Sequence, residues 1–250
     1  MSSSKLRDLV LAGVKWELSE IPTVIAKQSA DKNEKTSVAP SVDSAACVVP
    51  PIAPTQMMSI DTVRSMAARP MDIDSLKRMI GEFNHPLRST VANTVLPHVG
   101  NGKLLILTDI PGADDDMSGV LLSGASGELM DKMLSAIGLS RTEVSIVPML
   151  FWRTPGGRTP SRDELDLSRP FVDKAIDLIK PSVILSLGTL PATEYGGVNL
   201  AKSHGVQIDM ENGVRFIPIF HPNYLLLKPV AKRDVWTALQ NVQNILKNLE

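Results

Sequence analysis

Short apolar runs alternate with amphipathic segments along the C-terminal part of the chain, and this alternation constrains the fold most strongly. The apolar runs are too short for helices and predict buried strands, at residues 104–108, 144–147, 183–187 and 216–220. Apolar residues at helical spacing predict helices at residues 127–137, 162–179 and 231–249, with a shorter one through Thr193. Such alternation is typical of parallel sheets with both faces covered. We therefore predict an α/β fold with three αβα layers around a central four-stranded parallel sheet.

The first 58 residues follow a different pattern. Residues 4–20 repeat apolar side chains near helical spacing, which predicts an N-terminal helix. Residues 27–58 combine four prolines with Ala, Ser, Thr and Val, and this composition is typical of a flexible, disordered linker. We divide the chain into an N-terminal helix (1–26), the linker (27–58) and an α/β domain (59–250). Two short helices are expected at its start, from residue 59 and over 76–83, the second capped by Asp74 or Ser75.

Composition narrows the possible functions. The net charge is −1, so any contact with nucleic acid needs a local basic patch. Cys47 is the only cysteine, which excludes an intramolecular disulfide and a metal site built from several thiolates of one chain. No apolar stretch approaches the roughly 20 residues that span a membrane. The first residues lack a secretory-signal pattern, so we expect a cytoplasmic protein.

The loop after the first predicted strand carries candidate chemistry. The loops that follow parallel strands meet at one edge of the sheet, where such folds bind ligands. Asp109 stands at this edge and can orient or deprotonate a water, and Gly112 allows a ligand to approach the backbone. Asp114, Asp115 and Asp116 leave two other interpretations open: a solvated acidic turn, or a site for a hard cation. Their spacing is not that of an EF-hand, and we predict no metal.

Two later loops carry basic and apolar residues. Trp152, Arg153 and Arg158 lie in a loop stiffened by two prolines that can follow a phosphate backbone, although an exposed Pro-Gly turn has the same composition. His221 follows the last predicted strand, where it is either a ligand-site residue or a histidine of a hydrophobic turn. The leucines at 225–227 are either core residues or a wedge for a base stack, with Lys228 as a positive edge.

Taken in order, these segments resemble the uracil-DNA glycosylase superfamily, closest to its bacterial and archaeal iron–sulfur branch, family 4. The resemblance runs from about residue 83 to the C-terminus. Each matching segment is a weak motif, but eight of them occur in the same order. The matching segments are residues 90–95, 109–114, 124–134, 137–139, 152–160, 169–171, 187–188 and 221–226.

The resemblance implies hydrolysis of the N-glycosidic bond of a deaminated base in DNA, as in base excision repair. Asp109 would position water and His221 would donate to the leaving base. The base pocket implied by the resemblance comprises Ile110, Pro111, Gly112, Leu122 and Pro148. The implied DNA contacts, with a base flipped out of the stack, are Trp152, Arg153, Arg158, Leu225, Leu226 and Lys228.

The chain departs from the family pattern at several of these positions. Asp109 replaces a glutamate and is shorter by one methylene, Leu122 replaces the aromatic that stacks on uracil, and Pro148 replaces the asparagine that reads the uracil edge. One cluster cysteine maps to Ser168 and another falls near His85, so we expect no iron–sulfur cluster and no other cofactor. These changes predict weak activity or an altered base preference.

Two alternative functions follow from the same residues. The chain could be an inactive superfamily relative that binds DNA or a protein, with the N-terminal helix as a tether to that protein partner. A nucleotide-binding or small-molecule-binding α/β protein is the other alternative. The missing Gly-x-Gly-x-x-Gly after the first strand and the missing phosphate-loop lysine argue against it.

Overall fold

The computed structural model describes residues 59–88 and 93–249, and the structural statements below concern these residues. Five strands form one sheet in the order β2-β1-β3-β5-β4. Their bounds are β1 Leu104–Thr108, β2 Val144–Pro148, β3 Val183–Leu187, β4 Ile208–Asp209 and β5 Arg215–Ile219. The first three and β5 pair in parallel, whereas β4 is antiparallel to β5. The predicted α/β sandwich is confirmed, with β4 as an additional edge strand too short to show a sequence pattern.

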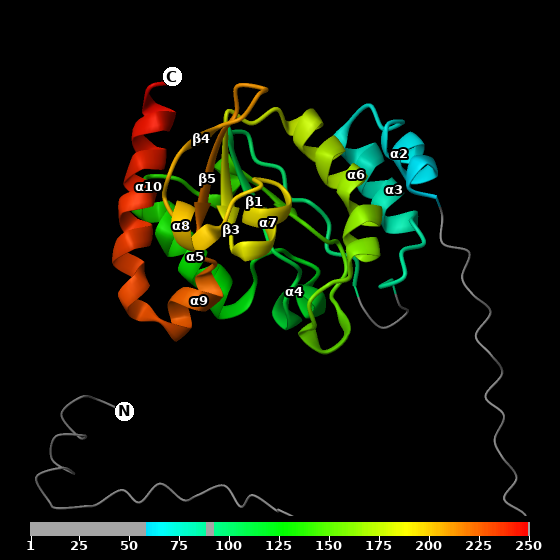
Figure 1. Ribbon diagram of the computed structural model, residues 1–250, viewed down its shortest axis with the longest axis horizontal. Coiled ribbons are helices and arrows are strands. Elements are labelled where there is room, and N and C mark those ends of the chain that lie inside the picture. The colour runs from blue at the N-terminus through cyan, green and yellow to red at the C-terminus, as the bar shows by residue number, and fades with distance from the viewer. Residues whose placement is uncertain (1–58, 89–92, 250) are drawn as a thin grey trace, which may run out of the picture. The chain divides into compact units, whose positions relative to one another are not determined.

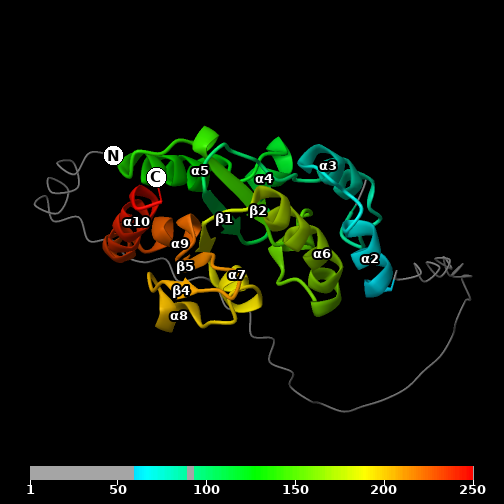
Figure 2. The ribbon, with the colours of Figure 1, turned by 90° about the horizontal axis from the view of Figure 1, so that it is seen from above.

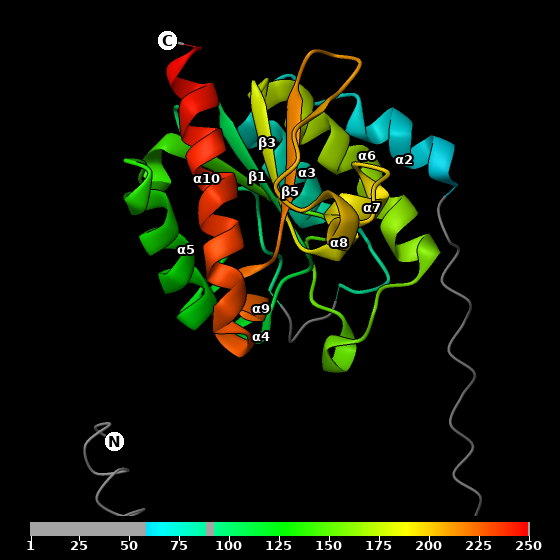
Figure 3. The ribbon, with the colours of Figure 1, turned by 60° about the vertical axis from the view of Figure 1, so that its left-hand side comes forward.

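Helices cover both faces of the sheet. In Figures 2 and 3, α5 and α10 lie on one side, and α2, α3 and α6 lie on the other. The helices are α2 Ile60–Ala67, α3 Ile73–Glu82, α4 Ala113–Ser118, α5 Gly124–Ala136, α6 Arg162–Ile179, α7 Thr189–Glu194, α8 Leu200–Ser203, α9 Pro222–Leu227 and α10 Lys232–Lys247. Among the described residues, no helix has the length and apolar character needed to cross a membrane.

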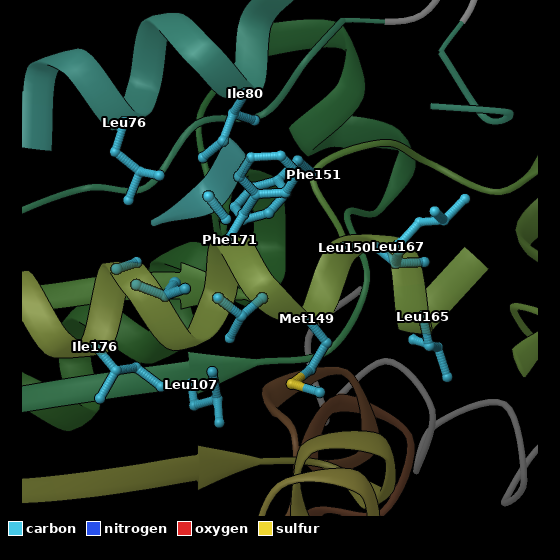
Figure 4. Packing of buried hydrophobic residues seen from close by; sticks show 14 of the residues in the cluster. Leu76, Ile80, Leu107, Met149, Leu150, Phe151, Leu165, Leu167, Phe171 and Ile176 are labelled. Carbon is cyan, nitrogen blue, oxygen red and sulfur yellow. The ribbon is translucent and has the colours of Figure 1, made fainter. Parts of the chain in front are cut away.

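Two hydrophobic clusters hold the layers together, one on each face. Successive strand residues point to opposite faces, so Leu105 and Leu107 pack toward α3 and α6, while Leu104 and Ile106 pack toward α5 and α10. Figure 4 shows the first cluster, where Leu76 and Ile80 of α3 lie over Phe151 and Phe171. Every residue of β1 is therefore buried, which explains the four successive apolar residues with which it begins.

The strand order places a crevice at one end of the sheet. The chain goes from β1 outward to β2 and then returns across β1 to β3. The connection after β1 therefore runs toward one edge of the sheet, and the connection after β3 runs toward the other edge. In open α/β sheets, ligands bind outside the carboxyl ends of the strands at the point where the strand order reverses in this way. Helices α4 and α9, which follow β1 and β5, lie at this same end of the domain (Figure 1).

Several local predictions need correction. The cap of α3 is Asp72, not Asp74 or Ser75, because the Asp72 carboxylate accepts from the Ser75 N–H at 2.8 Å. The short helices α4, α8 and α9 were not predicted. His221 therefore precedes a helix and does not lie within an extended loop. The predicted N-terminal helix and linker lie outside the described residues, and the domain boundary at residue 59 stays a prediction.

The cap assignment can be tested by unfolding. Asp72→Ala is expected to lower the free energy of unfolding by about 1 kcal/mol, since it leaves a backbone N–H of the first turn without its acceptor. Asp74→Ala serves as the control, because Asp74 lies in the same turn without capping it. Urea denaturation of both variants checks this, and an equal loss in the two would contradict the assignment.

Candidate active site

A cavity of about 770 Å³ opens at the carboxyl ends of three parallel strands. The segment after β1 contributes Asp109, the one after β3 contributes Gly188, and the one after β5 contributes His221. Residues that are far apart in the sequence therefore share one cavity. The remaining lining residues are Ile110, Pro111, Gly112, Ala113, Arg153, Gly157, Thr189, Asn199, Leu200, Ala201, Phe220, Asn223, Tyr224 and Leu227.

The carboxylate of Asp109 has a pKa close to neutral pH. Burial raises the pKa of Asp109 from 3.8 to about 6, and the Ile110 N–H offsets part of this increase. Above that pH the group is an anion, and its elevated pKa makes it a stronger base than an exposed aspartate. The side chain can therefore orient and deprotonate a water in the cavity.

His221 is neutral and presents one ring N–H. Its Nδ1 accepts from the Asn223 N–H at 3.2 Å, which caps α9. A neutral ring carries one proton, and this hydrogen bond assigns that proton to Nε2. Burial lowers the pKa of His221 to about 4, so the ring stays uncharged at neutral pH. The side chain is thus a hydrogen-bond donor through Nε2 without being an acid.

Gly188 allows the two side chains to approach each other. Its φ of +94° belongs to a region that residues with side chains rarely adopt. A Cβ at this position would lie 3.0 Å from Asp109 Oδ2 and 3.5 Å from His221 Cβ. A side chain here would crowd the carboxylate, so the turn after β3 needs glycine for both its backbone conformation and its space.

The acidic segment after Asp109 has a structural role. Asp115 is buried and accepts from the Gly112 N–H at 3.0 Å and from the Ser123 N–H at 2.7 Å. Asp116 accepts from the Asn93 N–H at 2.8 Å. Residues 59–88 and 93–249 contain no group of three or more side chains placed to hold a metal ion. The Asp115 carboxylate therefore holds Gly112 of the cavity wall in place, and Asp116 ties the same segment to Asn93.

The structure brings only part of the predicted base pocket together. Ile110, Pro111 and Gly112 line the cavity as expected from the sequence. Leu122 and Pro148 do not line it, and the structure places both in the core. Leu122 is 2% exposed and packs in the cluster beneath α5 and α10, and Pro148 is the buried last residue of β2.

The predicted DNA contacts also separate into two groups. In the free protein, Trp152 and Leu225 are buried in the two hydrophobic clusters and expose no surface to DNA. Arg153 lines the cavity, and Leu226 and Lys228 are exposed at the end of α9. Arg158 is half-exposed, but its guanidinium forms two hydrogen bonds with the Glu164 carboxylate, one of them 2.9 Å long.

Four polar residues of the cavity wall were not predicted from the sequence, namely Thr189, Asn199, Asn223 and Tyr224. Thr189 directly follows Gly188, and its position just after a predicted strand indicates a residue of the ligand site. Tyr224 lies three residues after His221, and recognising α9 as a helix would have put both on one face. Asn199 precedes the short helix α8, and no sequence pattern pointed to it.

Comparison with known proteins identifies the fold family. The Uracil DNA glycosylase superfamily matches residues 97–242, a range that contains all three strand ends of the cavity. The chain belongs to this superfamily.

Its relatives include Type-4 uracil-DNA glycosylases from three organisms. The protein of Archaeoglobus fulgidus is 30% identical over 59% of this chain and 79% of its own length. The protein of Thermotoga maritima is 30% identical over 66% of this chain and 80% of its own length. The protein of Pyrobaculum aerophilum is 31% identical over 66% of this chain and 89% of its own length. These relatives agree with a position near family 4.

The residues of this chain do not fit an iron–sulfur cluster. Such clusters are typically held by four cysteines, and the chain has one. His85 is buried, with Nε2 3.0 Å from the Glu164 carbonyl oxygen and Nδ1 accepting from the Leu87 N–H at 3.1 Å. Its ring stacks on Trp152 at a centroid distance of 4.5 Å. The hydroxyl of Ser168 is a poor substitute for a thiolate. Aromatic packing therefore occupies this region.

The raised pKa of Asp109 predicts a gain in stability on neutralising it. At pH 7 the carboxylate is ionised in the folded and unfolded states, and its burial costs about 3 kcal/mol at most, since one pKa unit corresponds to about 1.4 kcal/mol. Asp109→Asn is expected to raise the free energy of unfolding by about 1–3 kcal/mol at pH 7. The wild type loses stability as the pH rises from 3.8 to about 6, because the folded state then has to bury a charge. The difference in unfolding free energy between Asp109→Asn and the wild type should therefore disappear below pH 3.8.

Urea denaturation at several pH values measures this gap. Asp114→Asn is the matched control, because Asp114 is an exposed aspartate in the same segment. A gain for Asp109→Asn that does not change with pH would contradict the burial of an ionised carboxylate.

Proposed function

We propose that the protein is a DNA N-glycosylase that hydrolyses the bond between a deaminated base and its sugar. This proposal rests on one observation: a partly buried carboxylate, Asp109, and a neutral donor, His221, converge on one cavity in a domain of the uracil-DNA glycosylase superfamily. The curated relatives are glycosylases by name, which supports the same class of reaction. Base excision repair is the process in which such a hydrolysis takes place.

In the proposed reaction, the carbon–nitrogen bond breaks and its electron pair moves onto the base. The His221 Nε2–H donates a hydrogen bond to the oxygen on which the negative charge develops, and such stabilisation is a large part of catalysis at anionic centres. Asp109 orients a water toward the sugar carbon and takes its proton as the new carbon–oxygen bond forms. The flipped base would lie against the backbone of residues 110–112, which lines the cavity.

We propose that the base preference differs from that of a site with an asparagine in the pocket. Pro148 has no side-chain donor or backbone N–H, and it is buried away from the cavity. Loss of a two-point contact with a base edge costs about 1–3 kcal/mol of discrimination. Four uncharged polar side chains of the wall remain for contact with a base, namely Thr189, Asn199, Asn223 and Tyr224.

DNA would approach across the mouth of the cavity. Arg153 lines it from the β2 side, and Leu227 lines it from α9 and is 82% exposed. Leu226 and Lys228 are exposed beside it, and the Lys228 amine lies 5.3 Å from the Tyr224 ring centre. This group combines apolar residues that can enter a base stack with cations that can contact phosphates.

A single-turnover assay tests the function. The protein, in excess over oligonucleotides containing uracil, hypoxanthine or xanthine, is expected to create alkali-labile sites with at least one base. Asp109→Asn and His221→Gln should each lower the rate about 100-fold, because they remove the base and the donor. The wild-type rate should increase as the pH rises through about 6, where Asp109 becomes ionised, and then level off.

Asp114→Asn and His98→Gln are matched controls outside the cavity lining and should retain the wild-type rate. Absence of alkali-labile sites for every base would reject the enzymatic proposal. Salt-dependent DNA binding that persists in the same preparation would then favour the inactive DNA-binding alternative.

We also propose that the protein works without an iron–sulfur cluster, on the basis of the single cysteine and the stacked His85 and Trp152. Protein purified without oxygen is expected to contain far less than one equivalent of iron per chain. A strong metal chelator should leave its midpoint of thermal unfolding unchanged. Stoichiometric iron with the visible absorption of a cluster would contradict this proposal.

A further inference from the structure

Thr108 is a buried polar residue at the edge of the active site to which the sequence assigned no role. It is the last residue of β1 and directly precedes Asp109. Its hydroxyl Oγ1 lies 3.3 Å from His221 Nε2, and its backbone carbonyl accepts from the Met149 N–H at 3.0 Å. The side chain is 3% exposed, so its hydroxyl sits within the protein and does not line the cavity.

The direction of this hydrogen bond follows from the other ring nitrogen. His221 Nδ1 accepts from the Asn223 N–H, so the single proton of the neutral ring is on Nε2. Nε2 therefore donates, and the Thr108 oxygen accepts. The same N–H would stabilise the leaving base in the proposed reaction, so Thr108 holds the donor in the free protein.

Two properties make Thr108 suited to hold and then release this donor. Threonine is branched at Cβ and has few side-chain rotamers, so its oxygen keeps a defined position. The 3.3 Å separation is at the long, weak end of the hydrogen-bond range, so a developing anion on the base can displace the hydroxyl. Because Thr108 and Asp109 are adjacent, one strand end sets the position of both catalytic groups.

We propose that Thr108 is a positioning residue: its hydroxyl accepts from the Nε2–H of His221 in the free protein and gives up this hydrogen bond when the leaving base becomes the acceptor. This inference rests on the proposed function for its catalytic part. Its structural part, the hydrogen bond in the free protein, can be measured without any substrate.

The test compares Thr108→Val, which keeps the shape and removes the hydroxyl, with Thr108→Ser, which keeps the hydroxyl. In the free wild-type protein, the Nε2–H proton of His221 should give a nitrogen-coupled NMR signal protected from exchange with solvent. The signal should broaden or disappear in Thr108→Val and return in Thr108→Ser. An unchanged signal in Thr108→Val overturns the proposal.

Kinetics provide the second readout. Thr108→Val should lower the single-turnover rate about tenfold at saturating protein, with unchanged affinity for DNA, and Thr108→Ser should recover most of the rate. An unchanged rate in an active Thr108→Val protein also overturns the proposal. Should the valine variant not fold, Thr108→Ala removes the same hydroxyl without adding a branch. If the NMR signal responds but no variant or wild type is active, the proposed function fails while the hydrogen bond to Thr108 stands.

Discussion

The parallel pairing of β1, β3 and β5 is the constraint on which the site depends. Each strand ends in the same direction, so Asp109, Gly188 and His221 reach one cavity although long segments of chain separate them. The pairing in turn depends on the two hydrophobic clusters, because a parallel sheet is stable only with both faces covered. Gly188 at the end of β3 is needed for this arrangement, since its missing side chain leaves room for the Asp109 carboxylate.

Burial acts in opposite directions on the pKa values of Asp109 and His221. It raises the pKa of Asp109 to about 6 and lowers that of His221 to about 4, because in both cases the charged form loses its hydration. At neutral pH the result is an ionised carboxylate that binds protons more strongly than usual and a histidine that donates without carrying charge. The domain loses stability by holding the ionised Asp109, and such a loss is a common feature of active sites.

The departures from the family pattern fall in two regions with different consequences. Around His85 and Trp152, stacked rings and a buried histidine fill the region where the resemblance implies cluster ligands, so core packing compensates there. Leu122 and Pro148, two positions of the implied base pocket, are buried outside the cavity. The altered base preference that we propose rests on the second region.

The sequence by itself determined the layers and the strand ends, because apolar periodicity records which residues are buried. It predicted β1, β3 and α6 with the bounds that the structure has, and it placed Asp109 and His221 after strands. Only the tertiary structure decided which neighbouring side chains reach the cavity. Trp152 and Leu225 have residue types suited to DNA contacts, yet packing buries them, whereas Thr108 becomes a partner of His221 because the end of β1 and the start of α9 meet. Local patterns carry no information on such long-range contacts.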